Sequence, residues 1–196
     1  MTNERKITFY YEWLQLHKNE FRILSMLADQ GGSYNGNLSP ILDYFNLSHQ
    51  NKNRVQLRDS IIQLKTNEYI IHSETGRTHS LELIPKNTEI QMYAEWYEFL
   101  KNHRSTVESV SWIMVLKTYL WILHNNPENI ITNKDIAEEI NTSLTTLGYA
   151  KRVLKEEFEA FITEDRSVKL YDDRFIKIGH QIFPSAWWKN KELLFP

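Results

Sequence analysis

The sequence contains no cysteine. This absence excludes disulfide bonds, thiolate catalysis and cysteine-ligated zinc, and it is compatible with a reducing compartment. An apolar run long enough to span a membrane is lacking too, because polar residues interrupt the most apolar segment, Val107 to Leu123. The N-terminal residues lack the apolar core of a secretory signal. We therefore expect a cytoplasmic protein with no membrane partner.

The motifs of common catalytic sites are absent as well. There is no glycine-rich phosphate loop, no HExxH helix and no GxSxG elbow. The seven histidines are scattered, and His72 and His79 make a weak metal case without a carboxylate or thiolate beside them. We predict no enzyme activity, no catalytic residue, no metal and no cofactor.

Charges of the two signs are nearly balanced. The chain has 23 Lys and Arg against 25 Asp and Glu, which gives a formal net charge of −2. Neutralised phosphates supply most of the sequence-independent binding of DNA, so this chain would not hold DNA by its overall charge. Any affinity for DNA must come from local clusters of side chains.

The most informative stretch is Ile131 to Arg152. Apolar residues recur there at helix spacing in two groups, first Ile136, Ala137 and Ile140, then Leu147, Ala150 and Leu154. Between the groups, Asn141 tolerates the left-handed conformation of a sharp turn, and Ser143 can cap a second helix. The pattern predicts two short helices joined by a tight turn.

This spacing resembles the helix-turn-helix motif of bacterial DNA-binding proteins. The motif has a small residue, here Ala137, four positions before a turn residue that is usually Gly and here is Asn141. Thr142 departs from the pattern, which prefers an apolar residue. The resemblance implies that the second helix, Ser143 to about Phe158, enters a major groove with its N-terminal residues on the base edges. The alternative is an ordinary pair of packed helices.

The first half of the chain predicts a similar order of elements. We expect helices from Asn19 to Gly31-Gly32, from Ser39-Pro40 onward, and from about Asn51 to Asn67, with Asn19 and Ser39 as caps. Residues 35–37 are expected to extend a loop. Two β-prone runs, Tyr69 to Ser73 and His79 to Ile84, then predict a hairpin.

This order is similar to a winged helix-turn-helix domain. Leu57, Ile61 and Leu64 share one face of the third helix, and the hairpin that follows resembles a wing. Glu68 stands where that family usually has Gly. The alternative is a three-helix core with an incidental hairpin.

The second half is predicted as a divergent second copy. Thr88 to Leu100 is expected to form a connecting helix whose wide apolar belt packs within the chain or in a homodimer. Ser109 to His124 should be helical. After the helix-turn-helix stretch, strands are expected at residues 160–163, 167–171 and 174–178, with Asp172-Asp173 in a turn. An apolar tail is expected to pack back on the body, through Pro184, Trp187, Trp188, Leu193 and Phe195.

The predicted fold is mainly α with small β-hairpins, in two winged helix-turn-helix domains at residues 1–86 and 109–196 with a connecting helix and linker at 87–108. Polar side chains on the predicted recognition helices and wings are the candidate DNA-binding groups, because amide and basic groups suit base edges and phosphates. They are His49, Gln50, Lys52, Asn53, Gln56 and Arg77 in the first copy, and Lys134, Thr145, Thr146, Tyr149, Lys151, Arg152, Arg166 and Lys169 in the second.

The expected function is sequence-specific binding of double-stranded DNA without catalysis. Two routes stay open, a transcription regulator or an initiator of plasmid or phage replication, since such initiators often resemble paired winged helices. A different class is a protein–protein interaction module on the same scaffold.

Overall fold

A computed structural model describes residues 5–102, 110–126, 128–169 and 175–184 of the protein. Contacts within the chain divide it into two units, Met1–Glu98 and Phe99–Pro196. Each unit combines helices with small antiparallel sheets. None of the helices in the described ranges has both the length and the apolar character needed to cross a membrane.

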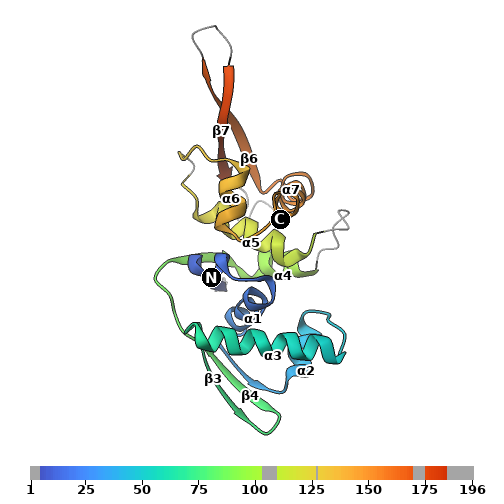
Figure 1. The fold of residues 1–196 in the computed structure, drawn as a ribbon. Helices are drawn as coiled ribbons and strands as arrows, with labels where there is room; N and C mark the ends of the chain where they lie inside the picture. Colours follow the sequence, from blue (N-terminus) through green and yellow to red (C-terminus); the bar gives the residue numbers. More distant parts are fainter. Residues whose placement is uncertain (1–4, 103–109, 127, 170–174, 185–196) are drawn as a thin grey trace. The chain divides into compact units, whose positions relative to one another are not determined.

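Three helices form the centre of the N-terminal unit: α1 (Lys18–Asp29), α2 (Leu38–Tyr44) and α3 (Asn51–Thr66) (Figure 1). They form where apolar residues recur every three or four positions, so that one face of each helix is buried. The predicted inner face of α3 is confirmed, because the side chains of Leu57, Ile61 and Leu64 are all buried.

The predicted cap of α2 is wrong. Asn37, and not Ser39, is the N-cap residue, and its side-chain oxygen accepts from the backbone N–H of Ser39 at 2.8 Å. Pro40 therefore lies at the third helical position, still within the first turn, where a backbone N–H has no partner inside the helix. The cap of α1 is His17 rather than Asn19, and its backbone N–H donates to the Glu20 carboxylate at 3.0 Å.

A three-stranded sheet lies beside these helices, in the order β2 (Ser33–Gly36), β4 (Thr78–Leu83), β3 (Ile70–Thr75). The predicted β3–β4 hairpin is confirmed, with a tighter turn at Gly76-Arg77. Residues 35–37 do not simply extend a loop, because Asn35 and Gly36 belong to β2 and pair with β4. The local sequence does not predict this strand, because its backbone hydrogen bonds come from β4, far along the chain.

A second sheet corrects the predicted connecting helix. Thr88 to Leu100 is not one helix: it contains strand β5 (Glu89–Tyr93), which pairs with β1 (Lys6–Tyr10), and helix α4 (Ala94–Asn102) begins only after it. Ile90 and Met92 are buried on one face of β5, two residues apart, as in a strand. In the sequence, these apolar residues run directly into the apolar residues of α4, so the two patterns together look like one apolar helix. Residues 11–15, between β1 and α1, form the short 3-10 helix η1 (Tyr11–Gln15).

The C-terminal unit begins with α5 (Trp112–His124), which is followed by α6 (Asn133–Glu139) and α7 (Leu144–Arg152) (Figure 1). The two short helices predicted between residues 131 and 152 are thus present. Helix α7 continues into a π-helical turn, η2 (Val153–Glu157). The apolar residues of both predicted groups, from Ile136 to Leu154, are buried.

Strands β6 (Phe161–Lys169) and β7 (Phe175–Pro184) form an antiparallel hairpin. The two short strands predicted at 160–163 and 167–171 are one strand with an irregularity in register between Arg166 and Ser167. Strand β7 also runs beyond the predicted end at 178 and includes Pro184. The expected turn at Asp172-Asp173 and the tail residues Trp187, Trp188, Leu193 and Phe195 lie outside the described residues.

The helix pairs of the two units have the same turn geometry. In each pair, the residue after the C-cap of the first helix is an asparagine with positive φ, Asn46 at 51° and Asn141 at 47°. The backbone N–H of the next residue then donates to the carbonyl five positions back, Leu47 to Leu42 and Thr142 to Ala137, both at 2.9 Å. This is the bonding of a Schellman helix end, in which the left-handed residue lets the chain reverse.

A second pair of left-handed residues leads into the hairpins. Glu68 (φ 56°) follows α3, and Glu159 (φ 47°) follows η2. Glu68 therefore adopts a conformation that glycine favours, at the position where the resembled family usually has Gly. Non-glycine residues rarely take this conformation, and it recurs in both units at the same two places in the order of elements.

Buried polar groups tie α5 to the helix pair of the C-terminal unit. The fully buried Lys117 Nζ donates to the backbone carbonyl of Ile140 at 2.7 Å. The indole N–H of Trp121 donates to the Glu139 carboxylate at 2.6 Å. Both bonds end at the last residues of α6, so α5 fixes the position at which the turn begins.

Candidate functional site

The N-terminal end of α3 presents the predicted polar residues in two different situations. Lys52 and Gln56 are exposed, and Gln50 is the exposed N-cap residue. The Asn53 amide, in contrast, donates to the backbone carbonyl and the hydroxyl of Ser48, at 2.8 and 3.0 Å, and so stabilises the turn. His49 pairs with the Asp43 carboxylate.

The N-terminal end of α7 is similar. Thr145 is exposed and Tyr149 is half-buried, whereas the Thr146 hydroxyl lies 2.9 Å from that of Ser143, the N-cap residue. Arg152, at the end of α7, forms an ion pair with Glu156 at 3.2 Å, and its side chain is 54% exposed. An exposed pair of this kind opens at little energetic cost, so the guanidinium remains available to another anion.

The remaining predicted cations lie apart from these helix ends. Lys134, on α6, pairs with Glu138 at 3.7 Å. Arg166, on β6, contacts Glu164 at 2.9 Å and donates to Gln181. Arg77 lies exposed at the β3–β4 turn, and Lys169 ends β6 with its side chain outside the described part of the chain.

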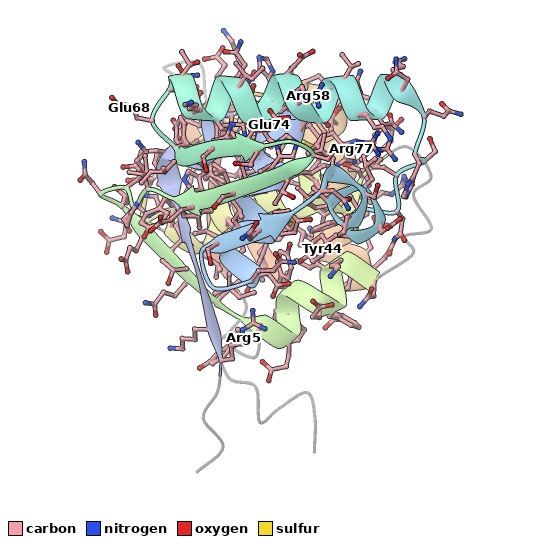
Figure 2. The ribbon with its side chains drawn as sticks, turned by 90° about the horizontal axis from the view of Figure 1, so that it is seen from below. Arg5, Tyr44, Arg58, Glu68, Glu74 and Arg77 are labelled. Carbon is pink, nitrogen blue, oxygen red and sulfur yellow. The ribbon has the colours of Figure 1, made fainter. Side chains whose placement is uncertain are left out.

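A basic pocket of about 370 Å³ lies between α3, the β3–β4 turn and the start of α2. We call it the arginine pocket, because Arg54, Arg58 and Arg77 line it together with His79. Its other lining residues are Asn37, Leu38 and Ser39. Figure 2 shows Arg58 on α3 and Arg77 at the end of the hairpin, so the guanidinium groups come from two separate elements. Three cations in one concave site create a positive potential that the net charge of the chain conceals.

Contacts inside the arginine pocket fix two of the three guanidinium groups. Arg54 donates to the backbone carbonyl of His49 and to the Ser39 hydroxyl, each at 3.2 Å. Arg58 lies 3.7 Å from the Glu74 carboxylate. Arg77 forms no hydrogen bond or ion pair with the residues that the structure describes in its unit, so it is the cation most able to accept a new anionic partner.

A second basic pocket, of about 270 Å³, lies in the C-terminal unit between α7, η2 and the β6–β7 hairpin. We call it the lysine pocket, after Lys151 and Lys155. The Lys151 Nζ donates to the Asn133 side chain at 2.8 Å and lies 3.0 Å from Nε2 of His180. The other lining residues are Gly148, Arg152, Phe161, Thr163 and Asp165.

The two pockets have corresponding histidines. His79 and His180 both lie on the second strand of the hairpin, and their exposed fractions are only 1% and 7%. Each pairs with the residue that directly precedes the N-cap of the first helix: Gly36 with His79, and Ile131 with His180. The pockets therefore lie at the same place in the order of elements of the two units.

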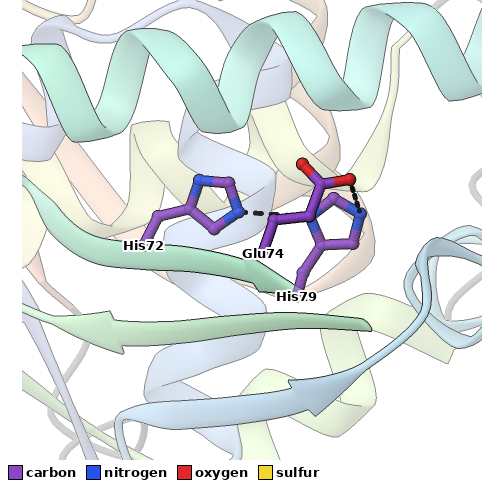
Figure 3. A group of neighbouring side chains, drawn as sticks. All are labelled: His72, Glu74 and His79. Atoms are coloured by element: carbon purple, nitrogen blue, oxygen red, sulfur yellow. Dashed lines mark hydrogen bonds and ion pairs between the residues drawn. The ribbon is translucent and has the colours of Figure 1, made fainter. Parts of the chain in front are cut away.

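His79 also belongs to a cluster with His72 and Glu74 (Figure 3). The expectation that no carboxylate stands beside the histidine pair is wrong: Glu74 Oε1 lies 3.7 Å from Nε2 of His79. Two imidazoles and a carboxylate are a ligand set that suits divalent transition metals. In the structure, however, Nε2 of His72 and Nδ1 of His79 are hydrogen-bonded at 3.1 Å, and Glu74 also lies near Arg58. A bound ion would have to replace that hydrogen bond.

Burial, and then the neighbouring His79 and Lys65, lower the pKa of His72, while Glu74 partly opposes the shift. The lowered pKa favours a neutral His72 ring, and the hydrogen bond between the two imidazoles requires only that one of the two facing nitrogens lacks a proton.

The sequence-based prediction missed five of the arginine, lysine and histidine residues that line the pockets: Arg54, Arg58, His79, Lys155 and His180. A usable signal was present, because Arg54 and Arg58 on α3, and Lys151 and Lys155 along α7 and η2, are spaced four residues apart and so share a helix face. For the histidines no local signal exists, since only strand pairing brings them to the helices.

No protein-family model matches the chain, and a search of curated proteins finds no match.

Proposed function

We propose that each unit is a winged helix-turn-helix domain and that the protein binds double-stranded DNA without catalysis. One observation carries the proposal: both units place a short helix, a left-handed turn, a second helix and a hairpin in the same order, with basic side chains gathered between the second helix and the hairpin. A groove of B-DNA offers base edges flanked by phosphates, which such a helix and hairpin can contact together.

In this proposal the N-terminal ends of α3 and α7 enter major grooves. Lys52 and Gln56 on α3, and Thr145 on α7, are the exposed groups nearest the base edges. The basic pockets then face the backbone. Because the whole chain carries a net charge of −2, its overall charge contributes little to DNA binding, and affinity depends on both helices contacting one site.

A monomer with two such domains would read an asymmetric site, whereas a homodimer would read a palindrome. Regulation of transcription and initiation of plasmid or phage replication both fit this mode of binding. Either role places the protein in the cytoplasm. Mapping a selected binding site beside a promoter or within an origin distinguishes the two roles.

A second candidate function, binding of another protein, is favoured by exposed apolar side chains on α3. Val55 and Ile62 are each 48% exposed, and their spacing of seven residues puts them on one side of the helix. A protein partner could cover that stripe, and net acidity would not oppose the contact.

Band-shift titration on genomic and plasmid fragments at two salt concentrations tests the proposal. We expect a preferred fragment, and we expect its affinity to fall steeply as salt rises. Lys52→Ala and Arg152→Ala should each weaken binding while leaving the fold intact, as judged by circular dichroism. Retention without a preferred fragment and without salt dependence would contradict DNA binding.

A further inference from the structure

We infer that each unit holds one backbone phosphate of the nucleic acid in its basic pocket, between the second helix and the hairpin and over the buried histidine. This inference rests on the proposed function, but it assigns a ligand to residues outside the exposed helix ends. The arginine pocket is the principal site, and the lysine pocket is its weaker counterpart.

The arginine pocket has the chemistry of an anion site. Guanidinium groups bind phosphate oxygens through paired N–H donors, and three arginines line this pocket. The nearest carboxylate, that of Glu74, lies 3.7 Å from Arg58 but is not among the lining residues. Ser39 and Asn37 add polar groups at the pocket's edge. Arg54 is held in place by its own hydrogen bonds, so it is positioned before a ligand arrives.

The buried His79 ring limits how deeply a ligand can enter the arginine pocket. The His79 ring is 1% exposed, and its two nitrogens face His72 and Glu74. The ring therefore forms a filled floor, and a ligand is held at the level of the guanidinium groups rather than drawn into the core. An exposed phosphodiester, whose two free oxygens project from a DNA backbone, suits such a shallow basic site.

The lysine pocket repeats the key contact with different residues. Arg58 is the eighth residue after the N-cap Gln50, and Lys151 is the eighth after the N-cap Ser143. Each lies in the same pocket as the buried histidine of its own hairpin. Asp165 also lines the lysine pocket and opposes an anion, which is why we rank this pocket as the weaker one.

Recurrence of this arrangement is the strongest argument for a ligand. Arg58 and Lys151 have different neighbours and different hydrogen bonds, so a shared role in folding does not explain why both are basic. In the proposed mode of binding, both places would lie where the second helix and its hairpin approach the DNA backbone. A shared role in holding backbone phosphate explains the charge at both positions.

The test compares salt dependence of DNA binding for the full chain and three variants: Arg77→Gln, Arg58→Gln and Lys151→Gln. Each should reduce affinity for all DNA sequences alike and lower the slope of log affinity against log salt by about 0.9 for each phosphate that the variant no longer neutralises. Lys6→Gln, an exposed cation on β1 of the N-terminal unit, removes the same charge outside both pockets and should leave the slope unchanged. Arg77→Gln breaks no hydrogen bond or ion pair among the described residues, so it separates binding from folding.

A titration with inorganic phosphate, followed by NMR of the arginine Nε–H signals, separates this inference from the proposed function. Binding of DNA with unchanged salt slopes in all three variants overturns the phosphate pockets and leaves DNA binding intact. If the chain binds no DNA while inorganic phosphate shifts the Arg58 and Arg77 signals, the proposed function fails and the backbone assignment is replaced by a site for free phosphate. Reduced slopes with unchanged sequence preference support the inference.

Discussion

The two units have the same order of helix, turn, helix and hairpin, but different strand pairing and different buried hydrogen bonds stabilise that order. In the N-terminal unit, strand β2 pairs with β4 over four residues, and the hairpin belongs to a three-stranded sheet. Among the described residues of the C-terminal unit, the corresponding contact is a single bridge between Ile131 and His180, and the hairpin forms a two-stranded sheet. The C-terminal unit has instead the buried bond from Lys117 to the end of α6.

The comparison separates features that differ between the units from features that both units share. The sheet can be reduced to one bridge, but the left-handed asparagine, the left-handed glutamate and the buried histidine remain in both units. The shared backbone geometry lies in the connections between elements, where it determines how the second helix packs against the hairpin. Substitutions in both units test this comparison.

The largest effect is expected at Gly179, next to the single bridge. A Cβ there would lie 2.8 Å from the backbone oxygen of Ile131, which cannot move without breaking the bridge to His180. Gly179→Ala should lower the free energy of unfolding by roughly 1–3 kcal/mol, the usual cost of overpacking, as measured by urea denaturation.

Gly148 provides a matched control within the same unit. It lies in α7 with nothing within 4 Å of an added Cβ. Gly148→Ala should raise the free energy of unfolding by about 0.5–1 kcal/mol, because alanine loses less entropy in a helix. Equal effects of the two substitutions would show that the Ile131–His180 bridge does not support the C-terminal unit.

A smaller effect of opposite sign is expected at the left-handed glutamates. Glu68→Gly and Glu159→Gly should each stabilise the protein by about 1 kcal/mol, because the left-handed conformation is strained for a residue with a Cβ. Gln63→Gly, on the exposed side of α3, should destabilise it by a similar amount. Stabilisation at only one of the two glutamates would show that the connections before the two hairpins are not equivalent.

The smallest effect concerns pH and only the N-terminal unit. Because the pKa of folded His72 is lowered, the unfolded chain binds more protons between that pKa and the ordinary value of about 6.5. The free energy of unfolding should therefore be fully maintained above about pH 6.5 and should fall as the pH decreases toward the folded pKa. His72→Asn should flatten this dependence, measured by amide hydrogen exchange in β3 and β4. A slope that is identical in the variant would assign the effect to other groups.

Sequence periodicity predicted the elements whose burial is local. Helices α3, α5, α6 and α7 and the β3–β4 hairpin were predicted because their apolar spacing is regular. Strand β2 and strand β5 were missed, since Asn35, Gly36 and Ile90 acquire strand geometry only through partners far along the chain. The cap at Asn37 was missed because Ser39-Pro40 forms a stronger local start signal.

The candidate site was predictable in part for the same reason. Residues at the helix ends, such as Lys52 and Thr145, follow from helical phase alone. Grouping Arg77 with Arg58 requires the hairpin to fold beside α3, and pairing His180 with Lys151 requires the Ile131 bridge. Contacts between residues so far apart in the chain produce no periodic pattern in the sequence, so they could not be predicted from it.

The buried Lys117 affects how the C-terminal unit unfolds. Detaching α6 and α7 from α5 would break the bond between its ammonium and the Ile140 carbonyl, and breaking the contact of a buried charge with one of its partners costs several kcal/mol. A partly open state with α5 still packed is therefore unfavourable. The three helices should open as one cooperative unit, so their slowest amide protons should exchange with solvent at a common free energy.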